Sequence, residues 1–240
     1  MIDSHTGGEP FRVVIDGLPD IPSSSMLERR RYAMENLDHL RRALMWEPRG
    51  HADMYGGWVG PPIEPGSDLS VLFVHNDGFS TMCGHGIIAL SKVLIDTGIV
   101  AVDTYPLRLR IDTPAGTVTS SSSIEEGRVV ATSFRNVPSF AAGLDMSIVV
   151  EEWGVVDFDL AFGGAYYAVV ESAPLGLGLR DVTRLVSAGT AIKSQINRTM
   201  TIDHPGQSDL GFLYGVIFTG VASDPHSHSR NVCVFADGRG

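Results

Sequence analysis

The sequence predicts an α+β protein with two halves of similar content, in which β-strands dominate and helices are few. Short segments with apolar residues in alternation recur along the chain, and turns rich in Gly and Pro separate them. One helix, from Cys83 to about Thr97, is apolar almost all round, which is typical of a helix wrapped by a sheet. The chain has 240 residues, a length that suits one large or two small domains. We expect these domains at residues 1–115 and 116–240.

The composition excludes several classes of protein. With 43% hydrophobic and 19% charged residues, the chain can bury a core and is not disordered. A net charge of −10 argues against nucleic acid as a partner. The basic residues at 29–31 and 41–42 lie on one predicted helix and are interpreted as a solvated face. No apolar stretch reaches the ~20 residues of a membrane span, and no basic-then-apolar leader opens the chain.

The cysteine content indicates a reducing compartment. Cys83 and Cys233 are the two cysteines, and they provide no disulfide framework. We therefore expect a cytoplasmic protein.

The first half is predicted to combine several strands with two helices. A capping box from Ser25 to Glu28 opens a long helix that Pro48 ends. Gly98 stops the helix that starts at Cys83. The strands are expected at residues 11–15, 53–59, 69–75 and 107–111.

The second half is predicted to repeat this mixture. Asp181 caps an amphipathic helix whose apolar face includes Leu185 and Ile192. Asp237 and Gly238 signal a turn after the last strand, and the sequence stops two residues later. The strands are expected at residues 117–123, 128–136, near 160, and at 166–170, 210–218 and 231–236.

The segment 81–90 carries the strongest indication of chemistry. Cys83 stands where a loop becomes a helix, and Gly84 and Gly86 flank His85 directly after it. The first amides of a helix lack internal partners and carry the positive end of the dipole, which lowers a cysteine's pKa. The same amides can hold a carboxylate. The alternative is packing, the commoner role of a free cysteine, but two glycines weaken a helix start and therefore indicate another purpose.

Five motifs resemble the proline racemase family, and together they cover essentially the whole chain. They are DSHTGGEP (3–10), EPRGH (47–51), MCGHG (82–86), FGG (162–164) and NVCVFAD (231–237). Within the family, RGHADMYG (49–56), HNDGFS (75–80) and FLYG (212–215) resemble the trans-3-hydroxy-L-proline dehydratases more closely.

The resemblance implies a fold and a site. The fold is two similar domains, each a curled β-sheet around a central helix as in diaminopimelate epimerase, with the active site between them and without metal, pyridoxal phosphate or flavin. Cys83 would be the general base, and Gly84, His85 and Gly86 would hold the substrate carboxylate. The resemblance also places His5, Thr6, Gly7 and Gly8 in a loop near the site. Tyr55 and Phe235 would line the pocket, although an aromatic residue in a strand, such as Tyr55, more often belongs to the core, and a core role is an equal alternative for Phe235. Cys233 is interpreted as core.

The resemblance implies a lyase that dehydrates trans-3-hydroxy-L-proline to pyrroline-2-carboxylate. The alternatives are a two-thiol proline racemase or 4-hydroxyproline epimerase, and an inactive fragment that only binds small carboxylates. The family carries a second motif just past Ala236 and Asp237, in which racemases have Cys and the dehydratase has Thr. Since the sequence ends at Gly240, before that motif, the 240-residue chain itself is expected to be inactive and its second domain incomplete. We expect a small-molecule substrate, no nucleic-acid or membrane partner, and leave a homodimer open.

Overall fold

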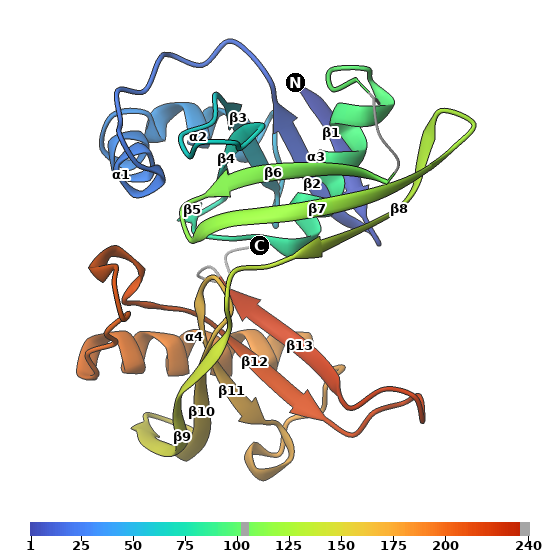
Figure 1. Cartoon of the computed structure of the whole chain (residues 1–240). Helices are drawn as coiled ribbons and strands as arrows, with labels where there is room; N and C mark the ends of the chain where they lie inside the picture. The colour runs from blue at the N-terminus through green and yellow to red at the C-terminus, as the bar shows by residue number, and fades with distance from the viewer. Residues whose placement is uncertain (102–105, 236–240) are drawn as a thin grey trace. The chain divides into compact units, whose positions relative to one another are not determined.

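The computed structural model describes residues 1–101 and 106–235, which form two compact units, Met1–Val137 and Pro138–Gly240 (Figure 1). The boundary lies 22 residues later than the sequence-based division at 115/116, because residues 116–135 continue the first sheet as two antiparallel strands. The expected turn at Asp237 and Gly238 lies outside the described residues. None of the helices in the described part is long and apolar enough to cross a membrane.

Within the described residues, the first unit holds an eight-stranded sheet in the order β1-β2-β3-β4-β6-β7-β8, with β5 paired to β4. The strands are β1 (Ile2–Thr6), β2 (Glu9–Val14), β3 (Tyr55–Gly60), β4 (Leu69–His75), β5 (Gly78–Ser80), β6 (Leu107–Thr113), β7 (Gly116–Glu125) and β8 (Arg128–Arg135). The pairs β2–β3 and β4–β6 are parallel, and the other pairs are antiparallel.

Helix α3 (Gly84–Asp96) is the central element of the first unit. It contacts β1 and β2 at one end of the strand order and β7 and β8 at the other, so the sheet curls around it. Its apolar side chains are buried on all sides, including Ile87, Leu90 and Leu94. The prediction of an enclosed apolar helix is therefore confirmed.

Helices α1 (Met26–Asn36) and α2 (Asp38–Met45) connect β2 to β3 and contact β4. The sequence predicted one continuous helix here. The helix is interrupted at Leu37, whose ψ of 9° lies outside the helical range and whose buried side chain joins the core under both helices. The capping box is present, since the Ser25 hydroxyl accepts a hydrogen bond from the Glu28 N–H (3.2 Å).

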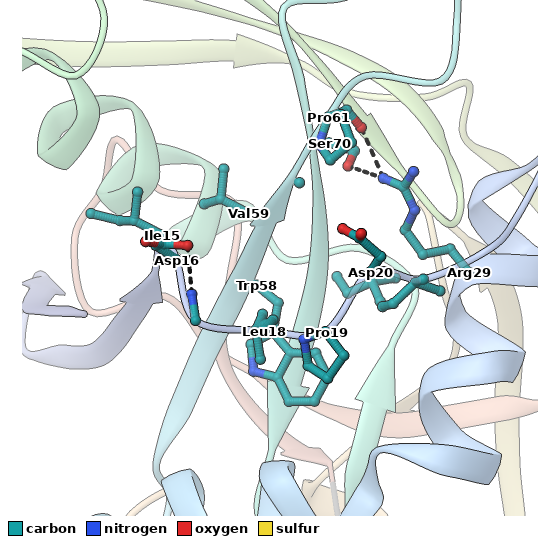
Figure 2. Close-up of a pocket in the computed structure, with 14 residues that line it drawn as sticks. Ile15, Asp16, Leu18, Pro19, Asp20, Arg29, Trp58, Val59, Pro61 and Ser70 are labelled. Atoms are coloured by element: carbon teal, nitrogen blue, oxygen red, sulfur yellow. Dashed lines mark hydrogen bonds between the residues drawn. The ribbon is translucent and has the colours of Figure 1, made fainter.

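The sequence predicted a solvated face for the basic residues at 29–31 and 41–42, which holds for Arg31 and Arg42 but is wrong for Arg29 and Arg41. Arg29 and Arg41 are only 8% and 4% exposed. Arg29 Nη1 donates to the carbonyl of Pro61 (2.8 Å) and to the hydroxyl of Ser70, which fastens α1 to the sheet (Figure 2). Beside it, a cavity of about 360 Å³ lies between residues 15–21 and the ends of β3 and β4. A guanidinium supplies several donors at once, so it can be buried where carbonyls need partners.

The second unit holds a sheet in the order β13-β12-β11-β10-β9, with α4 (Val182–Thr199) packed against it. Its strands and 3₁₀ turns are β9 (Phe140–Val150), β10 (Gly154–Phe162), β11 (Tyr166–Glu171), η1 (Ala173–Leu175), η2 (Ser208–Leu210), β12 (Leu213–Gly220) and β13 (Arg230–Phe235). Only β11 and β12 pair in parallel, and α4 connects them.

The two units share a connection pattern. In the first, an antiparallel pair β1–β2 is followed by helices and then by β3, parallel to β2, and β4, antiparallel to β3. In the second, β10–β11, α4 and β12–β13 repeat the same order and directions. The prediction of two similar α+β halves is confirmed at this level.

Three local predictions were wrong. His5 and Thr6, which were expected in a loop with Gly7 and Gly8, belong to β1 because their backbone pairs with β2, and only Gly7 and Gly8 make the turn. The long strand β9 was not predicted, since its alternation leaves most side chains outside the core. Cys233 is exposed, because it points to the open face of β13 while its neighbour Val234 is buried.

Candidate functional site

Cys83 lies at the N-cap of α3, as the sequence predicted. Its Sγ accepts a hydrogen bond from the Gly86 N–H at 3.3 Å. The ring of His85 lies beside the thiol, with Nδ1 at 3.3 Å and Nε2 at 3.8 Å from Sγ. One helical turn therefore brings together a thiol, an imidazole and a helix N-terminus. These are the parts of a thiol acid/base pair.

The protonation state of this pair differs from the sequence-based expectation. Burial raises the pKa of the Cys83 thiol to about 12, although the Gly86 N–H and a side-chain hydrogen bond from Tyr55 lower it. The charge of Glu9 adds to the increase. The helix end does favour the thiolate, but removal of the thiol from water outweighs it. Burial also lowers the pKa of His85, so its ring is neutral near pH 7 and can accept a proton.

The two glycines around His85 are explained by packing. A Cβ on Gly86 would stand 2.5 Å from Cε2 of Phe11 and 3.0 Å from Cε1 of Phe73. A Cβ on Gly84 would stand 2.9 Å from Cζ of Phe134. Aromatic side chains of the unit's own sheet therefore favour glycine at both positions. The binding of a substrate carboxylate by the backbone amides of this segment stays a prediction.

Tyr55 belongs to the surroundings of the thiol. It is 4% exposed, and its hydroxyl shares a short hydrogen bond with the buried hydroxyl of Ser80. Its ring packs edge-on against His85, with centroids 5.2 Å apart, and stacks on His75 at 5.5 Å. The core interpretation of Tyr55 and its site interpretation are thus compatible, because this part of the core borders Cys83.

The N-terminal hairpin meets the start of α3. The Thr6 hydroxyl donates to the carbonyl of His85 at 3.0 Å, and the Gly8 N–H donates to Nδ1 of His5 at 3.3 Å. Thr6 therefore lies next to the candidate site, whereas His5 stabilises the turn of its own hairpin.

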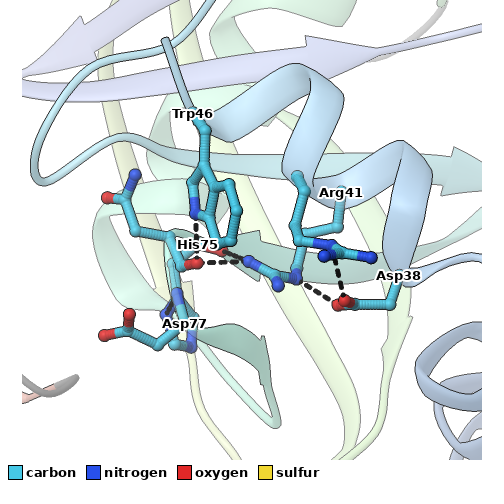
Figure 3. Close-up of polar contacts among 7 residues, drawn as sticks. Asp38, Arg41, Trp46, His75 and Asp77 are labelled. Atoms are coloured by element: carbon cyan, nitrogen blue, oxygen red, sulfur yellow. Dashed lines mark hydrogen bonds and ion pairs between the residues drawn. The ribbon is translucent and has the colours of Figure 1, made fainter.

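The turn between β4 and β5 is held by α2 (Figure 3). Arg41 donates to the carbonyls of His75 (2.8 Å) and Asn76, and its Nε pairs with Asp38 at 2.6 Å. Trp46 Nε1 also donates to the Asn76 carbonyl, at 2.7 Å. These bonds fix the strand end from which His75 stacks on the ring of Tyr55. The contact between His75 and Tyr55 could not be predicted from the sequence, because it depends on the β3–β4 register, in which these two residues are directly opposite.

Phe235, the remaining predicted site residue, lies at the end of β13 in the second unit. Its ring stacks on Tyr214, with centroids 5.7 Å apart and planes at 14°. Its place in a pocket with Cys83 stays a prediction. In residues 1–101 and 106–235, no group of three or more His, Cys, Asp or Glu side chains is placed to hold a metal ion.

The family model described as proline racemase matches residues 1–240. The chain belongs to the proline racemase family. A trans-3-hydroxy-L-proline dehydratase of Bacillus thuringiensis subsp. konkukian is 44% identical over 240 residues, which cover 99% of this chain and 72% of that protein. A 3-hydroxyproline 2-epimerase of Burkholderia multivorans is 41% identical over 238 residues, 98% of this chain and 71% of that protein.

A solved structure shows the same fold. The crystal structure of a hydroxyproline epimerase from Agrobacterium vitis, with bound trans-4-hydroxy-L-proline, matches with a TM-score of 0.89 and 28% identity. The match covers 97% of this chain and 69% of that one.

Proposed function

We propose that this chain provides the Cys83 half of an enzyme that dehydrates trans-3-hydroxy-L-proline to pyrroline-2-carboxylate. The observation that carries the proposal is the thiol of Cys83 at a helix N-terminus, 3.3 Å from the neutral imidazole of His85. The likeness to trans-3-hydroxy-L-proline dehydratases at 44% identity supports the choice of substrate.

The stereochemistry of the substrate favours a single thiol. In the trans isomer the hydroxyl on C3 and the hydrogen on C2 lie on the same ring face, opposite the carboxylate. A Cys83 thiolate on that face takes the C2 proton, and the resulting thiol returns the proton to the departing hydroxyl, which leaves as water. The enamine product then tautomerises to the imine, and no second thiol is required.

The residues around Cys83 are proposed to accept its proton, to bind the substrate carboxylate and to line the pocket. His85 Nδ1 is placed to accept the thiol proton, which produces the thiolate beside the Gly86 N–H. Since this N–H is already bonded to Sγ and the His85 N–H also donates toward the thiol, the amide of Gly84 is the better candidate for the substrate carboxylate. Tyr55 and Phe235 remain proposed pocket residues. Proton abstraction beside a carboxylate is difficult, so these oriented groups must stabilise the charge that develops.

The test is a substrate comparison, made with the 240-residue chain and with the gene product that contains it. Incubation of the gene product with trans-3-hydroxy-L-proline is expected to give an imine that o-aminobenzaldehyde traps, whereas the 240-residue chain alone is expected to be inactive. L-Proline in heavy water is expected to give no D-proline. Racemisation of L-proline without imine from the hydroxylated substrate would refute the lyase. Epimerisation of hydroxyproline would favour the second candidate, which the 41% identity to a 3-hydroxyproline 2-epimerase supports.

The cysteines provide a matched pair of variants. Cys83→Ser is expected to abolish turnover, because a hydroxyl is far less acidic than a thiol and gives little base near neutral pH. Cys233→Ser is expected to leave turnover unchanged, since that side chain is exposed on the face of β13. Loss of turnover in Cys233→Ser with retention in Cys83→Ser would overturn the assignment of the base.

The proposed carboxylate-binding site at the amides that follow Cys83 can be tested separately. Pyrrole-2-carboxylate is a planar mimic of a C2 carbanion and is expected to bind with its carboxylate at the amides that follow Cys83. A crystal structure of the complex with that carboxylate held by arginine side chains would refute the amide seat. A homodimer and a cytoplasmic location also stay predictions, which light scattering and cell fractionation can test.

A further inference from the structure

The buried position of Cys83 creates a chemical problem. A base must lose its proton, yet the thiol is only 7% exposed and water provides little stabilisation for its charge. The Gly86 N–H supplies one donor to Sγ. A side-chain donor to Sγ would stabilise the thiolate further and so lower the pKa of the thiol.

The side chain of Tyr55 meets this need. It reaches the site from β3, its ring lies against His85, and its hydroxyl is hydrogen-bonded to the thiol of Cys83. The same hydroxyl shares a short hydrogen bond with Ser80, whose side chain is fully buried at the end of β5. A phenol has one proton to donate and can accept at its oxygen. The serine can therefore donate to Tyr55 while Tyr55 donates to Sγ.

We propose that Ser80 and Tyr55 form a hydrogen-bond relay that ends on Cys83 and stabilises its thiolate. The proposal rests on the proposed role of Cys83 as the base. In this role Tyr55 is a donor to the base, in addition to its proposed place in the lining of the pocket. In this arrangement Ser80 donates to the Tyr55 oxygen, Tyr55 donates to Sγ, and the thiol proton passes to His85. Only protons move, and no covalent bond to carbon changes in this step.

The packing holds the relay in place. His75 stacks on the ring of Tyr55 with centroids 5.5 Å apart, and Arg41 donates a hydrogen bond to the carbonyl of His75. Phe11 stacks on the Tyr55 ring with centroids 6.3 Å apart. Because Tyr55 is buried and the rings of Phe11, His75 and His85 pack against it, the phenol has little freedom to move.

The other titratable groups around Cys83 define the pH range of the test. Glu9 on β2 raises the pKa of the thiol, and His85 on α3 has a pKa below its usual value. His75 on β4 lies behind Tyr55. Because burial holds the pKa of His85 below its usual value, its ring stays neutral above about pH 7.5. Between pH 7.5 and 9.5, the reactivity of Cys83 therefore follows its own ionisation.

The experiment measures alkylation of Cys83 by iodoacetamide, with peptide mapping by mass spectrometry, in the wild type and in Tyr55→Phe. Loss of a hydrogen bond to a charged acceptor is expected to raise the thiol pKa by about one to two pH units. Since a more basic thiolate is also more nucleophilic, the rate at a given pH falls by about 3- to 10-fold. Cys233, exposed in the second unit, is the internal reference, and its rate should not change.

Two further variants make the result specific. Tyr32→Phe removes a phenol from the core beneath α1, away from the site, and is expected to leave Cys83 labelling unchanged. Ser80→Ala is expected to slow labelling in the same direction as Tyr55→Phe but by less. If Tyr55 instead donates to Ser80, removal of Ser80 would free the phenol for Sγ and labelling would accelerate, which would overturn the relay.

The remaining outcomes are also decisive. Equal or faster labelling of Cys83 in Tyr55→Phe would refute the proposal. Faster labelling would indicate that the substitution increases the exposure of the thiol and that the lost hydroxyl did not stabilise the thiolate. If Tyr55→Phe does not fold, the direction of change in Ser80→Ala decides. Labelling requires no substrate, so the relay can fail while dehydration of trans-3-hydroxy-L-proline is observed, and the reverse can also occur.

Discussion

A pair of alanine substitutions at the start of α3 separates packing from ligand binding. Gly84→Ala and Gly86→Ala add the same methyl group two residues apart in one helix, so both gain the same preference of alanine for the helix, about 1 kcal/mol. The new Cβ at Gly86 would lie 2.5 Å from the fully buried ring of Phe11 and 3.0 Å from that of Phe73. At Gly84 it would meet only the far end of the half-buried Phe134 ring, at 2.9 Å.

The difference between the two variants isolates the cost of overpacking. Rings enclosed in a sheet cannot retreat, and such insertions cost about 1 to 3 kcal/mol, whereas Phe134 can turn outward at little cost. We therefore expect Gly86→Ala to be less stable than Gly84→Ala by about 1 to 3 kcal/mol. Urea unfolding followed by fluorescence measures this difference from the midpoints at constant slope. Equal stability of the two variants, with loss of pyrrole-2-carboxylate binding in Gly86→Ala, would refute the packing explanation and restore the ligand explanation.

Three other perturbations follow from charged side chains, of which Asp112 and Arg41 are buried and Glu9 is exposed. Asp112 accepts four hydrogen bonds, so Asp112→Ala is expected to cost about 3 to 5 kcal/mol in urea unfolding, and Asp112→Asn, which can still accept from two amides, clearly less. Burial alone would raise the pKa of Asp112, but the hydrogen bonds that it accepts outweigh burial and hold the pKa below its usual value. The stabilisation that the Asp112 carboxylate provides is therefore present above about pH 4 and is lost as the pH falls through the lowered pKa. Asp112→Asn should flatten acid unfolding in that range. Glu9→Gln removes a charge that opposes the thiolate, and Cys83 alkylation should become faster at pH 8, with slower alkylation as the contradicting result. Arg41→Met leaves the carbonyls of His75 and Asn76 without their donor, and hydrogen exchange in residues 75–80 should increase without a matching increase in the second unit.

Local patterns predicted most elements because each half-buried strand and helix shows its period in the sequence. Residues 69–75 form β4 as expected, and Cys83 and Asp181 cap the helices that they were expected to cap. Strand β9 escaped prediction because a sheet edge with little burial lacks a strong apolar alternation. The helix break at Leu37 escaped because an apolar residue in the helical stripe does not reveal that the backbone turns there.

The basic cluster shows why composition alone misjudges burial. Arg29 and Arg41 stand among other charged residues, a pattern typical of a solvated face. Their burial depends on carbonyls of Pro61, His75 and Asn76, which lie more than 30 residues away in the chain. Only the fold determines which arginine meets such a carbonyl, so this contact could not be read from the local pattern.

The candidate site was predictable in its residues but not in its energetics. Sequence reasoning found Cys83, His85 and Tyr55 because the first two share a helix start and the third lies in a motif of the family. It expected an acidic thiol, because a helix dipole is visible in a sequence whereas desolvation is not. Burial reverses the sign, and raises the pKa of Cys83 to about 12. A thiol in this state is a weak nucleophile at rest but a strong base once ionised. Donors such as the Gly86 N–H and the Tyr55 hydroxyl then decide how often it ionises. In the proposed reaction, the burial that makes the Cys83 thiolate rare would also make it a stronger base toward the proton beside the carboxylate, so the proposed site needs both the apolar enclosure and its few donors.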